Sequence, residues 1–526
     1  MRKTTKNKII DSLYKEGIYS EYVPKEYDCI DLLKLKTISL ESTNEKPYTY
    51  TMNKNDTSLE RRTISIPEIG SYINLIKYLE SSNILNEIIK LSEKSTHSFS
   101  KIVTKKNKIR TFSNPYREDD LMSEKIKDED FIDNTIIKLR KCIGSLGILK
   151  LDIANFYGSF YTHNIAAIGN GAEWAEEQFR LDNTQEKHAD YKSLSNLDER
   201  VRGLNQKRTH GLLIGPQVSF IISEGLMSTI DFELEEQLKE RLGKKIDFIR
   251  FVDDYDVFIQ SDEYVPLVIL IFTKVLEKYG FVLSDNKTEY IKFPYYIYEN
   301  FKDIVTSYEN EITPNQLLDM YSKLANFELS KKQKGGLFFL ASNMEHLIND
   351  KNYEESVSLL LSIIRKNAKS IPVVCDTLLK INEKQYSEKI SEVIFDSLYE
   401  FLKSCIINHY DWEQVWLINT LIKLDHERLS DFLSEIMTDN LTELAVVMIL
   451  NEYDFDENFK TTLGKRIEKS SWFLSYELFR KSIVDEDILK KHFTDTKIIE
   501  NFKILKKNNC QIYKPSTKDN LDDLPF

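Results

Sequence analysis

Two adjacent acids stand at the centre of an apolar segment of this 526-residue chain. Asp253 and Asp254 lie in the stretch FVDDY, between the apolar arms FIRF and VFI. A strand–turn–strand interpretation places both carboxylates at the tip of a tight hairpin. Because neighbouring anions repel each other, a fold keeps them together at a cost unless a cation binds. Taken alone, the pair is equally compatible with ordinary turn chemistry.

A third acid, Asp152, follows the strand-like stretch ILKL and precedes IANFY. Taken alone it could merely cap a helix. Three carboxylates on adjacent strand ends, however, form the hard-oxygen site that Mg²⁺ prefers, with Mn²⁺ as an alternative. Two such ions can lower the pKa of an attacking hydroxyl and neutralise a pyrophosphate leaving group. The acids alone therefore leave a two-metal site as one hypothesis beside the turn and helix-cap interpretations, and their sequence context favours the metal site.

The elements that must position these acids lie in the glycine-rich part of the chain. Thirteen of the 16 glycines precede residue 290. Segments 147–156 and 247–260 predict strands, whereas 216–242 and 264–279 predict helices. This part is therefore a mixture of the α+β or α/β type.

From about residue 315 the pattern changes to the 3.6-residue period of helices. Three predicted apolar faces illustrate it: Val357, Leu360, Leu361 and Ile364; Ile390, Val393, Ile394, Leu398, Phe401 and Leu402; and Trp412, Val415 and Trp416. Polar breaks separate the helices, which predicts an irregular, HEAT-like α-solenoid or a helical bundle. We expect four regions: an N-terminal extension (1–54), an α+β region (55–310), an α-helical repeat region (311–505) and a flexible tail (506–526).

Composition limits where a nucleic acid could bind. The formal net charge is -12, so a strand of nucleic acid would have to be held in a local groove. Basic residues gather at 101–110 and at Arg202, Lys207 and Arg208, although such runs are more often solvated loops. No apolar run approaches the roughly 18 residues of a membrane span, and the N-terminus is unlike a secretion signal. Five scattered cysteines indicate reduced thiols in a cytoplasmic protein.

Four segments together resemble successive palm motifs A, B, C and D of reverse transcriptases. They are LDIANFYGSFYTH (151–163), GLLIGPQVSFIISE (211–224), RFVDDYDVF (250–258) and LSDNKTEYIKF (283–293). Upstream, RRTISIPEIGSYINLIKYL (61–79) is similar to the fingers segment. The resemblance covers roughly residues 55–300 and implies an α+β fingers–palm fold, followed here by the all-α helical-repeat region.

The residue pattern of these motifs is most similar to that of the abortive-infection reverse transcriptases of bacterial anti-phage defence. That resemblance implies synthesis of DNA from dNTPs, often without a template and primed by the protein, so that the DNA product is covalently attached. It also implies a homo-oligomer and no membrane partner. Related defence enzymes copy a noncoding RNA instead, and this alternative stays open. An inactive scaffold is disfavoured by the intact acids, and a metal-dependent nuclease would not need motifs B and D.

Carried over residue by residue, the resemblance assigns the metal ligands first. Asp152 and Asp253 match the ligands, and Asp254 matches the second acid of motif C. Ile153 would offer its backbone carbonyl to one ion. Lys287 matches the motif D lysine, a proton donor to pyrophosphate.

The resemblance also implies nucleotide-binding residues. Tyr157 falls at the position of the aromatic steric gate against a 2′-hydroxyl. Gly215 and Pro216 match the motif B turn, where the backbone approaches the incoming nucleotide. Three arginines are candidates for binding the triphosphate: Arg61, Arg62 and Arg110.

Some positions depart from the family pattern or have a weaker assignment. Ile214 stands where many templated enzymes have glutamine, and Gly158 stands where the abortive-infection pattern often has proline. His163 is expected to be structural, because one histidine cannot form a metal site. The priming tyrosine must be mobile to reach the metals, which favours Tyr48, Tyr50 and Tyr513.

Overall fold

The computed structural model describes residues 5–20, 22–27, 30–53, 61–103, 134–293, 304–305, 308, 312–331, 335–384 and 386–515. Arg110, Cys29 and most of the basic segment 101–110 lie outside these residues. Within them, the four remaining cysteines are buried: Cys142, Cys375, Cys405 and Cys510.

An antiparallel sheet of four strands carries the acidic motifs. Its strands are β3 (Gly147–Asp152), β4 (Phe248–Phe251), β5 (Asp254–Ile259) and β6 (Glu289–Lys292), in the order β4-β5-β3-β6. The predicted strand at 247–260 is present as the two arms of a hairpin. The predicted strand at 147–156 is shorter, because the chain leaves the sheet after Asp152.

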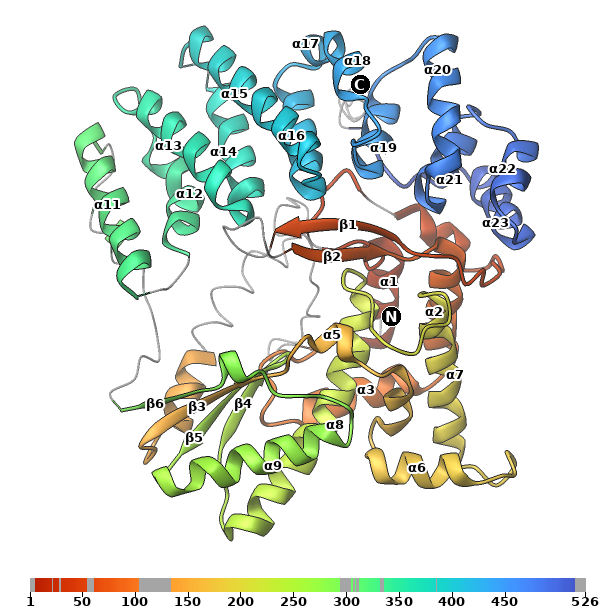
Figure 1. The fold of residues 1–526 in the computed structure, drawn as a ribbon, viewed down its shortest axis with the longest axis vertical. Coiled ribbons are helices and arrows are strands. Elements are labelled where there is room, and N and C mark those ends of the chain that lie inside the picture. Colours follow the sequence, from red (N-terminus) through yellow and green to blue (C-terminus); the bar gives the residue numbers. More distant parts are fainter. Residues whose placement is uncertain are drawn as a thin grey trace, which may run out of the picture.

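Helices α8 (Gln217–Leu242) and α9 (Val265–Glu277) match the two predicted helices to within two residues at each end. Phe272 of α9 packs edge-on against Phe248 and Tyr255 of the sheet. Figure 1 shows α8 and α9 together beneath the sheet. Helix α8 is buried without interruption from Gln217 to Asp231, so its charged residues there must find partners inside the protein.

Further elements surround this core. The helices are α1 (Thr5–Lys15), α2 (Ile69–Ser81), α3 (Ile84–Lys94), α5 (Phe156–Ser159), α6 (Ala172–Arg180) and α7 (Ala189–Gly203). The short 3₁₀ helices are η1 (Ile30–Leu35), η2 (Thr162–Ala167), η3 (Asp262–Tyr264) and η4 (Asp285–Lys287). Strands β1 (Tyr48–Asn53) and β2 (Arg61–Ile66) pair with each other as a separate antiparallel ribbon.

Every regular element that the structure describes after residue 311 is a helix. They are α11 (Pro314–Lys331), α12 (Gly336–Leu347), α13 (Tyr353–Lys366), η5 (Ala368–Ser370), α14 (Ile371–Glu383), α15 (Glu388–Ile407), α16 (Asp411–Leu424), α17 (His426–Asp431), α18 (Leu433–Ile436), α19 (Glu443–Glu452), α20 (Glu457–Gly464), η6 (Lys465–Lys469), α21 (Trp472–Arg480), α22 (Glu486–His492) and α23 (Thr496–Lys507). They follow one another in a row above the ribbon in Figure 1.

The predicted apolar faces are largely the buried faces of these helices. Trp412, Val415 and Trp416 are all buried, whereas Val393 is 40% exposed and was placed wrongly in the core. None of the helices in the described part of the chain has both the length and the apolar character needed to cross a membrane.

The expectation of a flexible tail from residue 506 is wrong as far as residue 515. Tyr513 is fully buried and donates to Oε1 of Glu452 at 2.7 Å. The hydroxyl of Tyr19 donates to the carbonyl of Ile512 at 2.8 Å. The polar composition of this segment is misleading, because its few apolar side chains insert between the N-terminal region and the helical region.

The ribbon of β1 and β2 lies against α16 and α19 of the helical region. Asn53 Nδ2 donates to Oε1 of Glu413 at 2.6 Å, and the amide of Thr51 donates to Oδ2 of Asp411 at 2.8 Å. Arg61 Nη2 lies 3.7 Å from Oε2 of Glu413, and the guanidinium stacks over the ring of Tyr410. A buried carboxylate therefore joins the ribbon to the helices.

We expect Glu413 to make the stability of the protein depend on pH. Glu413 is 1% exposed, and burial raises its pKa from 4.5 to about 7. The folded protein thus binds this proton more tightly than the unfolded chain, so stability falls as pH rises from about 4.5 to about 7. Relative to Glu413→Gln, wild type should lose about 3 kcal/mol across this interval, at about 1.4 kcal/mol per pH unit.

Denaturant unfolding of both proteins at about pH 5 and about pH 7.5 measures this change. Glu457, whose side chain is 88% exposed, supplies the matched control Glu457→Gln, for which no such pH-dependent difference should appear. A Glu413→Gln difference that stays constant with pH would show that the carboxylate is not desolvated in solution.

Candidate active site

The hairpin that bears the two adjacent acids turns through only two residues, Val252 and Asp253. Phe251 and Asp254 are the last paired residues of β4 and β5. Val252 has φ 58°, a left-handed conformation that is a true outlier for a β-branched residue. Such strain costs on the order of 1–3 kcal/mol and persists only where the surroundings enforce it.

Two side chains hold the strained turn from within the protein. Ser100 Oγ accepts the amide hydrogen of Val252 at 3.0 Å, and Arg250 Nη1 donates to the Val252 carbonyl at 3.0 Å. Segment 97–100 lies beside β4, because the amide of Arg250 donates to His97 and the amide of Phe99 donates to Arg250. Both peptide groups of Val252 are therefore fixed by buried partners.

Arg250 is itself clamped between two acids of α8. Its side chain is fully buried; Nη1 lies 3.0 Å from Glu224 Oε2, and Nη2 lies 2.9 Å from Asp231 Oδ2. Burial alone would lower the pKa of Arg250, but the two carboxylates outweigh it and raise that pKa well above its usual value. Surrounding hydroxyls donate to the remaining carboxylate oxygens: Ser92, Ser98, Ser100 and Ser228 to Glu224, and Ser95 and Tyr255 to Asp231.

This network was not predicted, although the sequence carries a signal for it. Glu224 and Asp231 are seven residues apart, so they share one face of the predicted helix 216–242. Arg250 lies in the otherwise apolar arm FIRF. Charges of opposite sign inside two apolar segments indicate an internal ion pair.

The structure brings the three predicted acids together at one end of the sheet. Asp152 is the last residue of β3 and pairs in register with Asp254, while Asp253 is in the adjoining turn. Burial and the charge of Asp152 raise the pKa of Asp253. Burial, a hydrogen bond with Asp152 and the charge of Asp253 raise the pKa of Asp254 to about 7. The carboxylates are thus crowded and partly desolvated, which favours binding of a cation.

Lys287 is the counter-ion of this cluster. Its Nζ lies 2.9 Å from Oδ1 of Asp152, and this hydrogen bond raises the pKa of Lys287. As the side chains stand, no three His, Cys, Asp or Glu residues in the described part of the chain are arranged to hold a metal ion. The donor set is of the oxygen type that Mg²⁺ prefers, but Lys287 occupies one oxygen of Asp152.

Ile153 and Tyr157 flank the acids. Ile153 is buried, and its amide donates to the carbonyl of Asp253 at 3.4 Å, which ties β3 to the turn. Tyr157 in α5 is half-buried, with its hydroxyl 3.4 Å from Ser223 Oγ. Burial raises the pKa of Tyr157 to about 12, and the charges of Asp253 and Arg62 also act on it. Tyr157 therefore lies within electrostatic reach of the acids.

Gly215 and Pro216 connect this site to the ribbon. Gly215 has φ 131°, and a Cβ there would lie 2.6 Å from the carbonyl oxygen of Ser65 in β2. The amide of Ser65 donates to the carbonyl of Ile214 at 2.7 Å, and Pro216 is the N-cap of α8. Glycine is required at this position because the backbone passes close to β2.

The three arginines proposed for the triphosphate are not equivalent. Arg61 faces α16 and is engaged by Glu413 and Tyr410, as described above, so it is turned away from the acids. Its neighbour Arg62 acts electrostatically on both Asp253 and Tyr157. Successive residues of a strand face opposite sides, which explains the difference. Arg110 lies outside the described residues.

The expectation that the three candidate priming tyrosines are mobile is wrong. Tyr48 and Tyr50 are in strand β1 and are 6% and 1% exposed, and Tyr513 is fully buried. Their hydroxyls bond Thr442, Ser20 and Glu452, and burial raises the pKa of all three. The alternating pattern YTYTMN is that of a strand with one buried face, which the polar flanks concealed.

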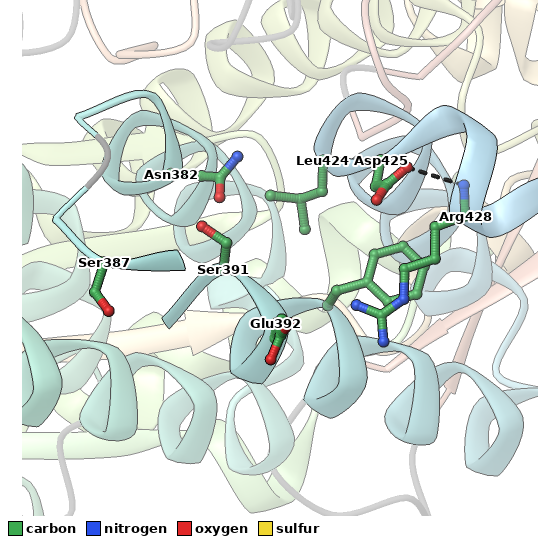
Figure 2. A pocket seen from close by; sticks show the side chains of 8 residues that line it. Asn382, Ser387, Ser391, Glu392, Leu424, Asp425 and Arg428 are labelled. Carbon is green, nitrogen blue, oxygen red and sulfur yellow. Dashed lines mark hydrogen bonds between the residues drawn. The ribbon is translucent and has the colours of Figure 1, made fainter. Parts of the chain in front are cut away.

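His163 has a structural partner, as expected: its Nδ1 lies 2.7 Å from Oδ2 of Asp198. A separate pocket of about 600 Å³ lies in the helical region, shown in Figure 2, and none of the predicted site residues lines it. Arg428 at its rim is already paired with Asp396 and stacked over Phe395, so its charge is satisfied.

Replacing Arg250 should test the network that holds the turn. Arg250→Met leaves Glu224 and Asp231 buried without a counter-charge, and we expect a loss of about 3–5 kcal/mol in the free energy of unfolding. Arg428→Met, which removes a half-exposed surface pair, is the matched control and should cost at most about 1 kcal/mol. Equal losses of unfolding free energy in the two variants would contradict the conclusion that Arg250 holds the hairpin in place.

No protein-family model and no curated protein matches this chain. Among solved structures, it is similar to apo telomerase from Candida tropicalis, with 13% identity and a TM-score of 0.32 over 74% of this chain. It is also similar to telomerase from Candida albicans in complex with a fragment of telomeric RNA, with 15% identity and a TM-score of 0.29 over 78% of this chain. The matches span 64% and 68% of those two chains. Similarity at this level assigns no family.

Proposed function

We propose that this chain is a nucleotidyltransferase of the reverse-transcriptase type that synthesises DNA from dNTPs. The observation that carries the proposal is the meeting of Asp152, Asp253 and Asp254 at adjacent strand ends, with Lys287 on Asp152. The order and spacing of the four palm-like motifs in the sequence support it further. Asp152 and Asp253 are the proposed ligands of two Mg²⁺ ions, with Asp254 beside them; Mn²⁺ is the alternative.

In the proposed reaction a hydroxyl oxygen attacks the α-phosphorus of a dNTP. The new O–P bond forms while the bond to the β-phosphate oxygen breaks, and pyrophosphate leaves. Bound divalent ions would supply charge neutralisation and a lowered pKa for the attacking hydroxyl. Lys287 is the proposed proton donor to pyrophosphate, because it lies on Asp152 beside the acids and a lysine is protonated near neutral pH. Arg62 is the better placed of the two described arginines for the triphosphate.

The resemblance to abortive-infection enzymes is the basis for proposing a role in anti-phage defence and assembly into a homo-oligomer. Synthesis without a template is proposed first, because Ile214 replaces the glutamine of many templated enzymes. Copying of a noncoding RNA is the alternative. Protein priming remains a prediction of the resemblance, but Tyr48, Tyr50 and Tyr513 are withdrawn as primers.

The proposed activity is tested by incubating purified protein with each labelled dNTP and Mg²⁺, without added primer or template, and resolving products on a denaturing gel. Sequencing of nucleic acid that co-purifies with the protein separates the two modes. A defined RNA together with its complement would establish templated synthesis, whereas DNA of unrelated sequence would establish untemplated synthesis. The proposal would be contradicted if the purified protein incorporated no labelled dNTP and neither kind of nucleic acid co-purified with it.

Asp253→Asn should reduce nucleotide incorporation by about a thousandfold, because charge stabilisation at a metal site is worth several kcal/mol. The thermal midpoint should not fall, since the substitution removes one of three mutually repelling carboxylates. Asp262→Asn is the matched control, because Asp262 pairs with Lys292 at the surface, away from the cluster. Wild-type incorporation by Asp253→Asn would remove these acids from the mechanism.

Tyr157→Ala should relax discrimination against ribonucleotides by about 10- to 100-fold, because a bulky ring at this position would clash with a 2′-hydroxyl. Tyr157→Phe keeps the ring and loses only the contact with Ser223, so its selectivity should match wild type. Competition between rNTPs and dNTPs measures the ratio. If the alanine variant keeps wild-type selectivity, Tyr157 is not the gate.

A further inference from the structure

An aromatic cluster outside the acidic site has no role in the function proposed above. Tyr161 is 37% exposed, and the rings of two histidines flank it. Its ring centroid lies 4.9 Å from that of His163 and 5.1 Å from that of His210. The ring of Tyr161 stands at 82° to that of His163 and at 39° to that of His210, so the exposed tyrosine is supported on two sides by imidazoles.

Two segments far apart in sequence hold this cluster in place. Tyr161 and His210 form an antiparallel bridge, and the amide of Thr162 donates to the carbonyl of Thr209 at 2.8 Å. His163 is fixed from below by Asp198, which is buried. The rings are therefore pre-ordered, which limits the entropy lost when a ligand stacks on them.

Unpaired cations adjoin the cluster along the chain. Lys207 and Arg208 are exposed, and neither forms an ion pair with any residue that the structure describes. Asp198 of the preceding helix α7 is already shared between His163 and Arg202. In a chain of net charge -12, such a local excess of positive charge is where a polyanion can approach.

The loop that presents these cations is strained. Gln206 and Lys207 have φ 54° and 59°, values that non-glycine residues adopt rarely. The amide of Lys207 donates to the carbonyl of Arg202 at 2.8 Å, which holds the loop against the end of α7. Lys207 and Arg208 are thus exposed in a loop whose backbone is tied to the end of α7.

The cluster is also connected directly to the proposed active site. The amide of Leu212 donates to the carbonyl of Tyr157 at 2.9 Å, and the amide of Gly211 donates to that of Phe160 at 2.8 Å. The same pair of segments therefore carries Tyr157 at one end and Tyr161 with His210 at the other. A strand bound on the cluster would lie next to the site where nucleotides are joined.

We propose that Tyr161, His163 and His210, together with Lys207 and Arg208, form a stacking platform for single-stranded nucleic acid. Aromatic rings bind any base through its π face, and adjoining cations bind the phosphates, so recognition needs no particular sequence. The platform deepens the proposed function, since it would guide a template or a product strand at the polymerase site. Its binding test, however, requires no catalysis.

The test is fluorescence anisotropy with labelled DNA and RNA strands of about 12 nucleotides, a length within the site sizes of such platforms. EDTA is present and dNTPs are absent, so failure of the polymerase proposal would not affect the readout. Tyr161→Ala should weaken binding about tenfold, whereas Tyr161→Phe should stay within about twofold of wild type. A circular dichroism spectrum checks that the alanine variant is folded, and His210→Ala supplies a second, independent weakening.

The charge contribution is tested with two matched double variants. The double variant Lys207→Gln with Arg208→Gln should make the negative slope of log affinity against log salt less steep by about 1.4, at about 0.7 per phosphate contact. Lys239→Gln with Arg241→Gln removes the same charge from the exposed far end of α8 and should leave the slope unchanged.

Loss of DNA binding alone assigns the platform to the product, loss of RNA binding alone assigns it to a template, and loss of both assigns it to either strand. Wild-type binding by Tyr161→Ala, or an equal effect of the two double variants, would overturn the platform.

Discussion

A buried guanidinium determines where the acidic hairpin can lie. Arg250 joins Glu224 and Asp231 of α8 to the carbonyl of Val252, so the longest helix of the sheet region and the tightest turn share one ion cluster. Hydrogen bonds from neighbouring serines satisfy the remaining oxygen atoms, which makes this burial of charge tolerable. The strained backbone of Val252 persists because both of its peptide groups have partners inside the protein.

The fixed turn also determines the positions of the three acids, Asp152, Asp253 and Asp254. Once the turn is fixed, the register of β3 and β5 places Asp152 beside Asp254 without any further choice. Burial and the repulsion between the acids raise the pKa values of Asp253 and Asp254, and Lys287 offsets only part of this effect. The site is therefore built to favour an added positive charge, although its side chains do not yet surround one point.

The parts of this arrangement that sequence could predict are those with local causes. The hairpin, the strand before Asp152 and helices α8 and α9 follow from apolar patterns within a few residues. Burial of Tyr513 could not be predicted in this way, because its partner Glu452 lies 61 residues away, whereas the alternation in YTYTMN was a local signal for Tyr48 and Tyr50 that the polar flanks concealed. The orientation of Arg61 likewise depends on Glu413, which is distant in sequence. A polar composition also conceals burial where a few apolar side chains of a segment pack against a part of the protein distant in sequence.

The contacts that hold the N-terminal region and the helical region together also bear on how the chain folds. The bond between Tyr19 and Ile512 spans 493 residues, and those between Glu41 and Asn501 span 460. Closing loops of this size costs chain entropy before any contact is gained, and such non-local contacts form slowly. The sheet with its two helices uses much shorter separations, such as 19 residues between Arg250 and Asp231. We therefore expect the sheet and its two helices to become ordered first, and the N-terminal region to pack only once the distant helices have assembled.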